Sequence, residues 1–135
     1  MDHAGINHGA VLAAAVAAWL WGAGWYRVFG HRWMKAARID PAAITMKAGP
    51  FVLGFLADIV IAYVLAGAIG HLGPGQVTLL NGIVSGAILW AGFIATVLAV
   101  SHRYQGFGWD LTAIDAGHWL GVMIIGGAII GWSGN

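Results

Sequence analysis

The sequence predicts an all-α fold, a four-helix transmembrane bundle, from its composition and from the length of its apolar stretches. Of its 135 residues, 60% are hydrophobic and 8% are charged. A soluble domain carries roughly 45–50% apolar and about 25% charged residues, so this chain has too few charges to cover a water-exposed surface. Four apolar stretches of about 20 residues, the length that crosses roughly 30 Å of hydrocarbon as a helix, lie at approximately 9–29, 50–70, 77–100 and 113–132.

These stretches leave too little chain between them for a separate folded domain, so residues 1–135 are expected to form a single integral membrane domain. Six Lys and Arg against five Asp and Glu create no basic field for nucleic acid, and none is expected as a partner. The chain has no Cys, which excludes disulfides and Cys-ligated metal centres.

The basic residues predict the orientation in the membrane, because Lys and Arg are retained on the cytoplasmic side. All six follow the first or the third apolar stretch, where with Trp33 they are expected to meet lipid headgroups: Arg27, Arg32, Lys35, Arg38, Lys47 and Arg103. His31 and His102 flank this group and are expected to do the same. Both termini are therefore expected outside the cytoplasm, facing the periplasm or exterior.

Two connections carry local signals. Asp40-Pro41 is typical of an N-cap followed by the first helical residue, and it predicts a short segment through Met46. With Trp33, Met34 and Lys35, this amphipathic segment is expected along the cytoplasmic interface. Thr112-Ala113-Ile114-Asp115 matches a capping box and predicts that the fourth helix begins there, with Asp115 as a capping carboxylate.

Small residues recur every four positions, which favours close contact between helices in lipid. They include the sets Ala10, Ala14, Ala18, Gly22; Gly54, Asp58, Ala62, Ala66, Gly70; Gly82, Gly86; and Gly117, Gly121, Gly127, Gly131, of which only Asp58 is not small. Packing within the chain and a homodimer face are both consistent with this spacing.

Ionisable groups inside the hydrocarbon are the first candidates for chemistry, since each is costly unless paired or hydrated. Asp58 lies within the second stretch, while Asp115 and His118 are spaced three residues apart on the fourth. With Thr96 as a hydroxyl partner, these residues are the candidate proton or ion site, or a polar anchor for a ligand. The alternative is structural: Asp58 and His118 bond each other or nearby indoles and fix the packing of the helices.

Tryptophan and histidine give two further hypotheses. Trp19, Trp21, Trp90 and Trp119 lie inside their stretches rather than at the interface, where Trp is commonest, and could form either core or an aromatic pocket for a quinone, pigment or lipid tail. The histidines on the outer side, with Asp2 nearby, form a weak metal candidate: His3, His8 and His71. No cofactor is expected apart from such a hydrophobic ligand. Nucleotide-binding, metalloprotease and hydrolase motifs are absent, so no enzyme activity is expected.

Several motifs together resemble a family of short bacterial four-helix membrane proteins, domain of unknown function 1761. They occur in order along nearly the whole chain: Trp25-Tyr26, Phe29-Gly30, Trp33-Met34, Trp90-Ala91-Gly92-Phe93 with Thr96, Ile114-Asp115-Ala116-Gly117 and Gly131-Trp132. The resemblance implies a bacterial inner-membrane location and a conventional four-helix topology. It also implies that Asp115 and the Trp25-Tyr26 pair are more important than a purely structural role suggests. It implies no activity.

Two function classes follow from these observations. The first is a non-enzymatic accessory or scaffold protein, which self-associates or docks on a larger membrane complex through its small-residue ridges. The second is a proton- or cation-linked transporter or channel subunit that uses Asp58 and His118. A binder of a hydrophobic ligand is the third hypothesis.

Overall fold

The computed structural model describes residues 5–45 and 47–134, and within them the chain forms helices and connections only. The helices are α1 (His8–Ala36), α2 (Ala48–Gly70), α3 (Leu79–Leu89), α4 (Thr96–Tyr104) and α5 (Trp109–Ser133). A π-helical segment, η3 (Trp90–Ala95), joins α3 to α4 without a break. Four helical stretches are therefore long and apolar enough to cross a membrane: α1, α2, the continuous Leu79–Tyr104 helix, and α5.

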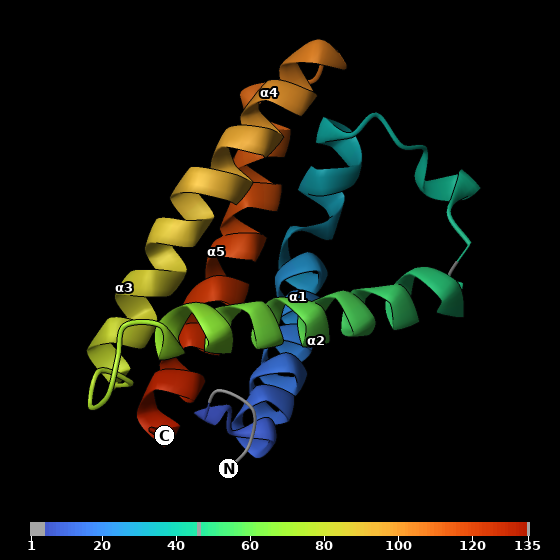
Figure 1. Ribbon diagram of the computed structural model, residues 1–135. Coiled ribbons are helices and arrows are strands. Elements are labelled where there is room, and N and C mark those ends of the chain that lie inside the picture. Colours follow the sequence, from blue (N-terminus) through green and yellow to red (C-terminus); the bar gives the residue numbers. More distant parts are fainter. Residues whose placement is uncertain (1–4, 46, 135) are drawn as a thin grey trace.

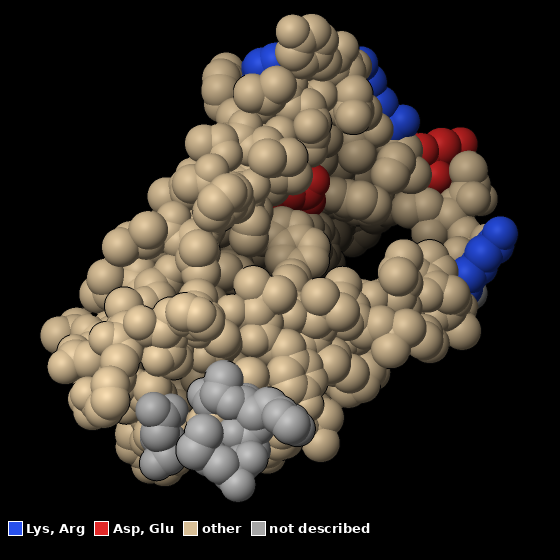
Figure 2. Space-filling model, in the orientation of Figure 1, with Lys and Arg blue, Asp and Glu red and all other residues tan. Residues whose placement is uncertain are grey.

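The arrangement places the two ends of the chain together. In Figure 1 the beginning of α1 and the end of α5 lie at the lower end of the molecule, while the ends of α1 and α4 lie at the upper end. Basic side chains gather at this upper end and along the connection from α1 to α2, as Figure 2 shows. The four long apolar helices agree with the four-helix prediction.

α2 departs from a conventional bundle, because it crosses the other helices at a large angle instead of running alongside them (Figure 1). Only its second half packs closely, through Ala62, Leu65, Ala66 and Ile69. In its first half, large apolar side chains are exposed: Phe51, Val52, Leu53 and Leu56. The buried small side chains of α2, Ala62 and Ala66, lie in the second half and permit close helix contact there, whereas the first half meets α1 through Trp19.

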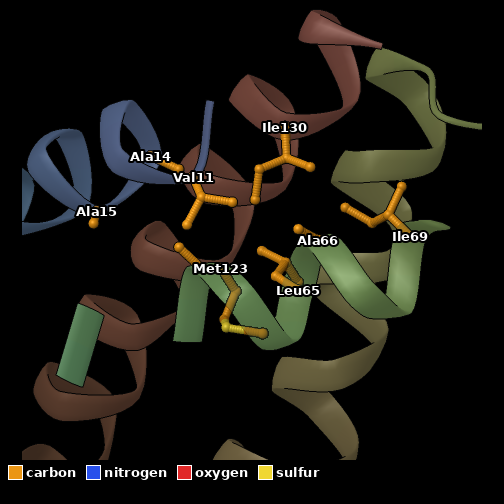
Figure 3. Close-up of a cluster of buried hydrophobic side chains, with 9 residues drawn as sticks. Val11, Ala14, Ala15, Leu65, Ala66, Ile69, Met123 and Ile130 are labelled. Carbon is orange, nitrogen blue, oxygen red and sulfur yellow. The ribbon is translucent and has the colours of Figure 1, made fainter. Parts of the chain in front are cut away.

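The main core lies where α1, α2 and α5 meet near the end that holds the termini. Figure 3 shows its buried side chains converging from the three helices; they are Val11, Ala14, Ala15, Ala62, Leu65, Ala66, Ile69, Met123 and Ile130. Alanine supplies much of the α1 face, so the helices approach closely.

Glycines bring α3 even closer to α5. A Cβ atom on Gly82 would overlap the carbonyl group of Gly127, and one on Gly86 would overlap the carbonyl group of Met123. Gly131 meets the Thr78 carbonyl in the same way. The glycine ridges of these two helices therefore pack against each other within one copy of the chain.

The connections differ from the sequence predictions in three respects. α1 continues to Ala36, so that Trp33, Met34 and Lys35 belong to it rather than to a separate interfacial segment. Asp40 does cap Pro41, but the helical turn is a short 3-10 turn, Pro41–Ala43, and Met46 lies outside the described residues. Because a proline-led turn of three residues provides no apolar face, no amphipathic helix forms among residues 37–45 and 47, the part of this connection that the structure describes.

The predicted capping box at Thr112–Asp115 is wrong. α5 begins four residues before the predicted start, at Trp109, with Gly108 as its N-cap and Asp110 in its first turn. Thr112 and Asp115 are therefore interior helical residues whose side chains face neighbouring helices. Glycines with positive φ at Gly73, Gly75 and Gly106 make the tight turns between helices.

Candidate functional site

A chain of polar side chains lies between α1, α4 and α5, and we call it the polar cluster. It consists of Tyr26, His102, Arg103, Thr112, Asp115 and His118. Three of its members, Thr112, Asp115 and His118, are three residues apart on α5, so each is about 4.5 Å further along the helix axis. The cluster therefore runs inward from the end of the molecule where the basic residues gather.

The outer part of the polar cluster is centred on Thr112. The guanidinium of Arg103 donates a hydrogen bond to its hydroxyl group, and the hydroxyl lies 2.8 Å from Nδ1 of His102. A hydroxyl has one proton and two acceptor sites, so Thr112 can accept from Arg103 and, depending on the tautomer of His102, either donate to Nδ1 or accept from it. Both His102 and Thr112 are buried.

Asp115 joins the outer part to the inner part. Its Oδ2 lies 3.6 Å from Nε2 of His102, and its Oδ1 accepts a hydrogen bond of 2.6 Å from the hydroxyl group of Tyr26. The first distance is too long for a direct hydrogen bond, so protonation of His102 would strengthen this contact by adding a charge. Asp115 thus sits between a titratable imidazole and a phenol.

His118 forms the inner end of the polar cluster. Its ring centroid lies 5.0 Å from that of Tyr26 and 4.6 Å from that of Trp119. Its Nδ1 is buried and has no hydrogen-bond partner among the described residues. A Cβ atom on Gly22 would lie 2.8 Å from Nε2 of His118, so Gly22 provides the space that the ring occupies.

Indole groups hold α5 in place around the polar cluster. Trp21 and Trp25 of α1 donate to the carbonyl oxygens of His118 and Ile114, each at 2.9 Å. Trp90 of η3 donates to the carbonyl oxygen of Ala116 at 2.8 Å. Buried indole N–H groups require acceptors, and here the backbone of α5 supplies three of them within five residues.

Replacing Trp21 with phenylalanine should lower the stability of the protein. The substitution keeps a ring but removes the N–H donor, and the loss of one such hydrogen bond is expected to cost about 1 kcal/mol. Thermal unfolding in detergent, followed by near-UV circular dichroism, measures the change. Trp132→Phe is the matched control, because Trp132 is 79% exposed, and it should leave the transition temperature unchanged. An equal loss in both variants would contradict this role for the indole.

The structure separates the four residues predicted as a proton or ion site. Asp115 and His118 belong to the polar cluster, but Thr96 donates its hydroxyl to the carbonyl of Gly92 in its own helix. Asp58 is 5% exposed, and no hydrogen bond to its carboxylate is present within residues 5–45 and 47–134. Asp58 therefore lies apart from the polar cluster, and the indoles bond to backbone carbonyls rather than to it.

The four tryptophans proposed as an aromatic pocket do not line one cavity. Trp21 and Trp90 pack on α5, Trp119 contacts His118, and Trp19 donates to the carbonyl of Phe51 on α2. Trp19 borders an apolar groove, which measures about 320 Å³ and is lined by Val16, Trp19, Leu20, Val52 and Phe55.

The histidines of the weak metal candidate make other contacts. Nδ1 of His8 lies 2.8 Å from the hydroxyl group of Tyr63, and Nδ1 of His71 donates to the Gly67 carbonyl. His3 lies outside the described residues. Within the described part of the chain, no group of three His, Cys, Asp or Glu residues is placed to hold a metal ion.

The basic residues divide into two groups. Five are exposed, as expected for contact with headgroups: Arg27, Arg32, Lys35, Arg38 and Lys47. Arg38 also donates to the Gly106 carbonyl at 2.5 Å and lies over the Phe107 ring. Arg103, by contrast, is partly buried, with its guanidinium carbon 3.8 Å from the centre of the Trp109 ring.

Sequence reasoning missed Tyr26 and His102 as site residues. His102 was expected at the headgroups because it stands beside Arg103. The Trp25-Tyr26 pair had been noted only through the family resemblance. A signal for both was present in their positions, since each is a polar residue within one or two turns of the end of an apolar stretch where basic residues gather.

These four crossings with a buried polar cluster define a multi-pass membrane protein that carries titratable groups inside its helices. The chain belongs to the family described as Protein of unknown function (DUF1761), whose model matches residues 9–131. Comparisons with curated proteins and with solved structures gave no match.

Proposed function

We propose that this protein is a small proton-linked transporter or channel subunit of the bacterial inner membrane. The observation that carries the proposal is the polar cluster. In it, His102 contacts Asp115, Asp115 accepts a hydrogen bond from Tyr26, and the ring of His118 lies next to the ring of Tyr26. Ionisable groups are costly in the hydrocarbon, and when present they usually mark a proton or ion path. In this proposal the protein carries out no catalysis.

The orientation follows from the basic residues. Lys and Arg are retained in the cytoplasm, and those of this chain flank the ends of α1 and α4. His102 and Arg103 lie in the last turn of α4. Protons would therefore enter the polar cluster from the cytoplasmic side, with both termini in the periplasm.

Each member of the polar cluster has a distinct part in this function. His102, in the last turn of α4, exchanges protons with the cytoplasm. Asp115 attracts the proton that His102 carries, and the Tyr26 hydroxyl links Asp115 to the region of His118. The unpartnered Nδ1 of His118 is the group that takes up or releases a proton at the inner end.

The accessory or scaffold function is the second candidate. The sequence alone allows the glycine ridges to serve as docking faces for another protein, but the structure uses most of them for packing within the chain. Gly82 and Gly86 pack against α5, while Gly117 and Gly121 receive the rings of Trp25 and Trp21. Packing within one copy thus accounts for these ridges. Among the described residues, a Cβ atom on Gly54 of α2 would have nothing within 4 Å, as is also true of Gly24, Gly67 and Gly92, and these positions remain available for close contact with another protein.

Proton flux into proteoliposomes tests the proposal. The purified protein is reconstituted with a pH-sensitive dye inside the vesicles, and a potassium diffusion potential drives protons inward. We expect Asp115→Asn to reduce the flux at least tenfold, because the amide cannot bind a proton. Asp110→Asn is the matched control: it changes an exposed acid on the same helix, and it should retain the flux of the unmodified protein.

The same preparation distinguishes the two candidate functions. If the unmodified protein carries no proton flux but runs as a stable oligomer or with a co-purified complex in native mass spectrometry, the accessory function replaces the proton-linked one. Equal flux from Asp115→Asn and the unmodified protein would exclude the polar cluster as the path.

A further inference from the structure

The π-helical segment η3 lies between two parts of one long helix, and both parts contact α5. Upstream, Gly82 and Gly86 fit against the α5 backbone. Downstream, His102 contacts Thr112 and Asp115. π turns are rare, and inside α-helices they frequently occur at functional sites, so this one needs a physical explanation.

The π turn determines which face His102 occupies. An α-helix turns by about 100° per residue, and His102 follows Gly86 by 16 positions. In an uninterrupted α-helix these two residues would be about 160° apart, on opposite faces. A π turn accommodates one additional residue, which reduces the angle to about 60°. Both residues can then face α5, as they do in the structure.

We propose that η3 is a register switch that connects and disconnects His102 from the polar cluster. When the π turn converts to regular α-helix, α4 rotates by about 100° relative to α3. Ser101 then takes the position that His102 holds beside Thr112, and His102 moves away from Asp115. Because α3 is fixed to α5 by its glycines, the rotation is confined to α4.

The local structure permits this conversion. The segment contains no proline, so every residue in it retains an N–H donor for either hydrogen-bonding pattern. Leu89 and Thr96, which flank it, both have regular right-handed helical dihedral angles. Phe93 is 71% exposed and Gly92 has no neighbour within 4 Å of a Cβ position, so the outer face of the segment can rearrange without displacing packed side chains.

One contact favours the π register. The hydroxyl of Thr96 donates a hydrogen bond to the Gly92 carbonyl at 2.9 Å. It thus supplies a hydrogen-bond donor to a carbonyl group inside the π-helical segment, where the regular backbone hydrogen bonds of an α-helix are interrupted. Thr96→Val removes this donor with little change of shape, and we expect it to increase the population of the α register.

Paired cysteines test the switch directly, because the natural chain contains none. His102→Cys with Thr112→Cys places the two thiols together in the π register. Ser101→Cys with Thr112→Cys does so in the α register. Disulfides require Cβ atoms about 3.5–4.5 Å apart, so the pairs discriminate between the two rotations. In membranes treated with a mild oxidant, we expect both pairs to crosslink.

Deletion of Phe93 provides the locked control. A helix shortened by one residue reaches the same face without a π turn, so His102 stays beside Thr112 permanently. The 102–112 crosslink should then form fully and the 101–112 crosslink should disappear, whereas Thr96→Val should increase the 101–112 crosslink at least twofold. Failure of the 101–112 pair to crosslink in the full-length chain and in Thr96→Val, or its persistence after the deletion, would overturn the switch.

Any effect of the register switch on proton transport rests on the proposed function, but the switch itself does not. If the crosslinks behave as expected and the protein carries no proton flux, the proposed function fails and the switch stands. If flux is measured and the 101–112 pair never crosslinks, the switch fails and the proposed function stands.

Discussion

Replacing Gly82 with alanine should disrupt the packing of α3 on α5. The added methyl group would overlap the backbone carbonyl of Gly127, and a backbone atom cannot move aside as a flexible side chain can. Overpacking of this kind costs typically 1–3 kcal/mol and occasionally more, roughly the range expected here. We expect a lower transition temperature, and faster proteolysis of the α3–α5 region in detergent.

Gly67→Ala is the matched control for this substitution. Gly67 also lies inside a membrane-spanning helix, but a Cβ atom there has no neighbour within 4 Å. Alanine favours helix over glycine by about 1 kcal/mol in soluble hosts, so this variant should be as stable as the natural chain or more so. If Gly82→Ala is tolerated as well as Gly67→Ala, the backbones of α3 and α5 do not make this close contact.

Replacing Asp58 with leucine should stabilise the protein. Asp58 is 5% exposed, and its carboxylate has no hydrogen-bond partner in the described part of the chain. A buried polar group without a partner costs about 1–3 kcal/mol, and an apolar side chain removes that cost. We expect a higher transition temperature for Asp58→Leu, measured by thermal unfolding in nanodiscs.

Asp115→Leu is the corresponding control for a carboxylate with partners. It leaves the Tyr26 hydroxyl and the His102 ring without their acceptor, so it should destabilise the protein. Opposite signs for the two variants would show that Asp58 is kept at a cost to stability, which is common for residues retained for function. A destabilising Asp58→Leu would instead identify the carboxylate as a structural contact.

The sequence is sufficient to predict the number and approximate limits of the crossings, because apolar length is a property of composition alone. It also predicts that all basic residues lie at the end of the first or third crossing or in the connection after it. α1 and the Leu79–Tyr104 helix extend beyond their apolar stretches, to Ala36 and Tyr104. Polar residues at those ends continue the helix, which hydropathy does not indicate.

The polar cluster was only partly predictable. Asp115 and His118 were identified because they are ionisable groups within an apolar stretch. His102 was not, since its contact with Asp115 depends on the π turn in η3, and no spacing rule for α-helices anticipates the rotation. The grouping of Asp58 with His118 failed because depth along a helix does not determine which face a residue occupies.

The capping-box prediction shows a second limit. Thr112 and Asp115 have the right residue types and spacing for a helix start, yet α5 begins at Trp109. Gly108 provides the actual N-cap without a side-chain hydrogen bond. The hydroxyl and carboxylate that would have capped the helix instead contact Arg103, His102 and Tyr26.

The strong inclination of α2 relative to the other helices affects the lipid around the protein. A helix of 23 residues is about 34 Å long, so when strongly inclined it covers less than the roughly 30 Å thickness of the hydrocarbon layer. Acyl chains beside it must then be shorter or more disordered than elsewhere, at an energetic cost that rises with hydrophobic mismatch. Bilayers built from shorter acyl chains should therefore favour this inclination, and thicker ones should draw α2 upright.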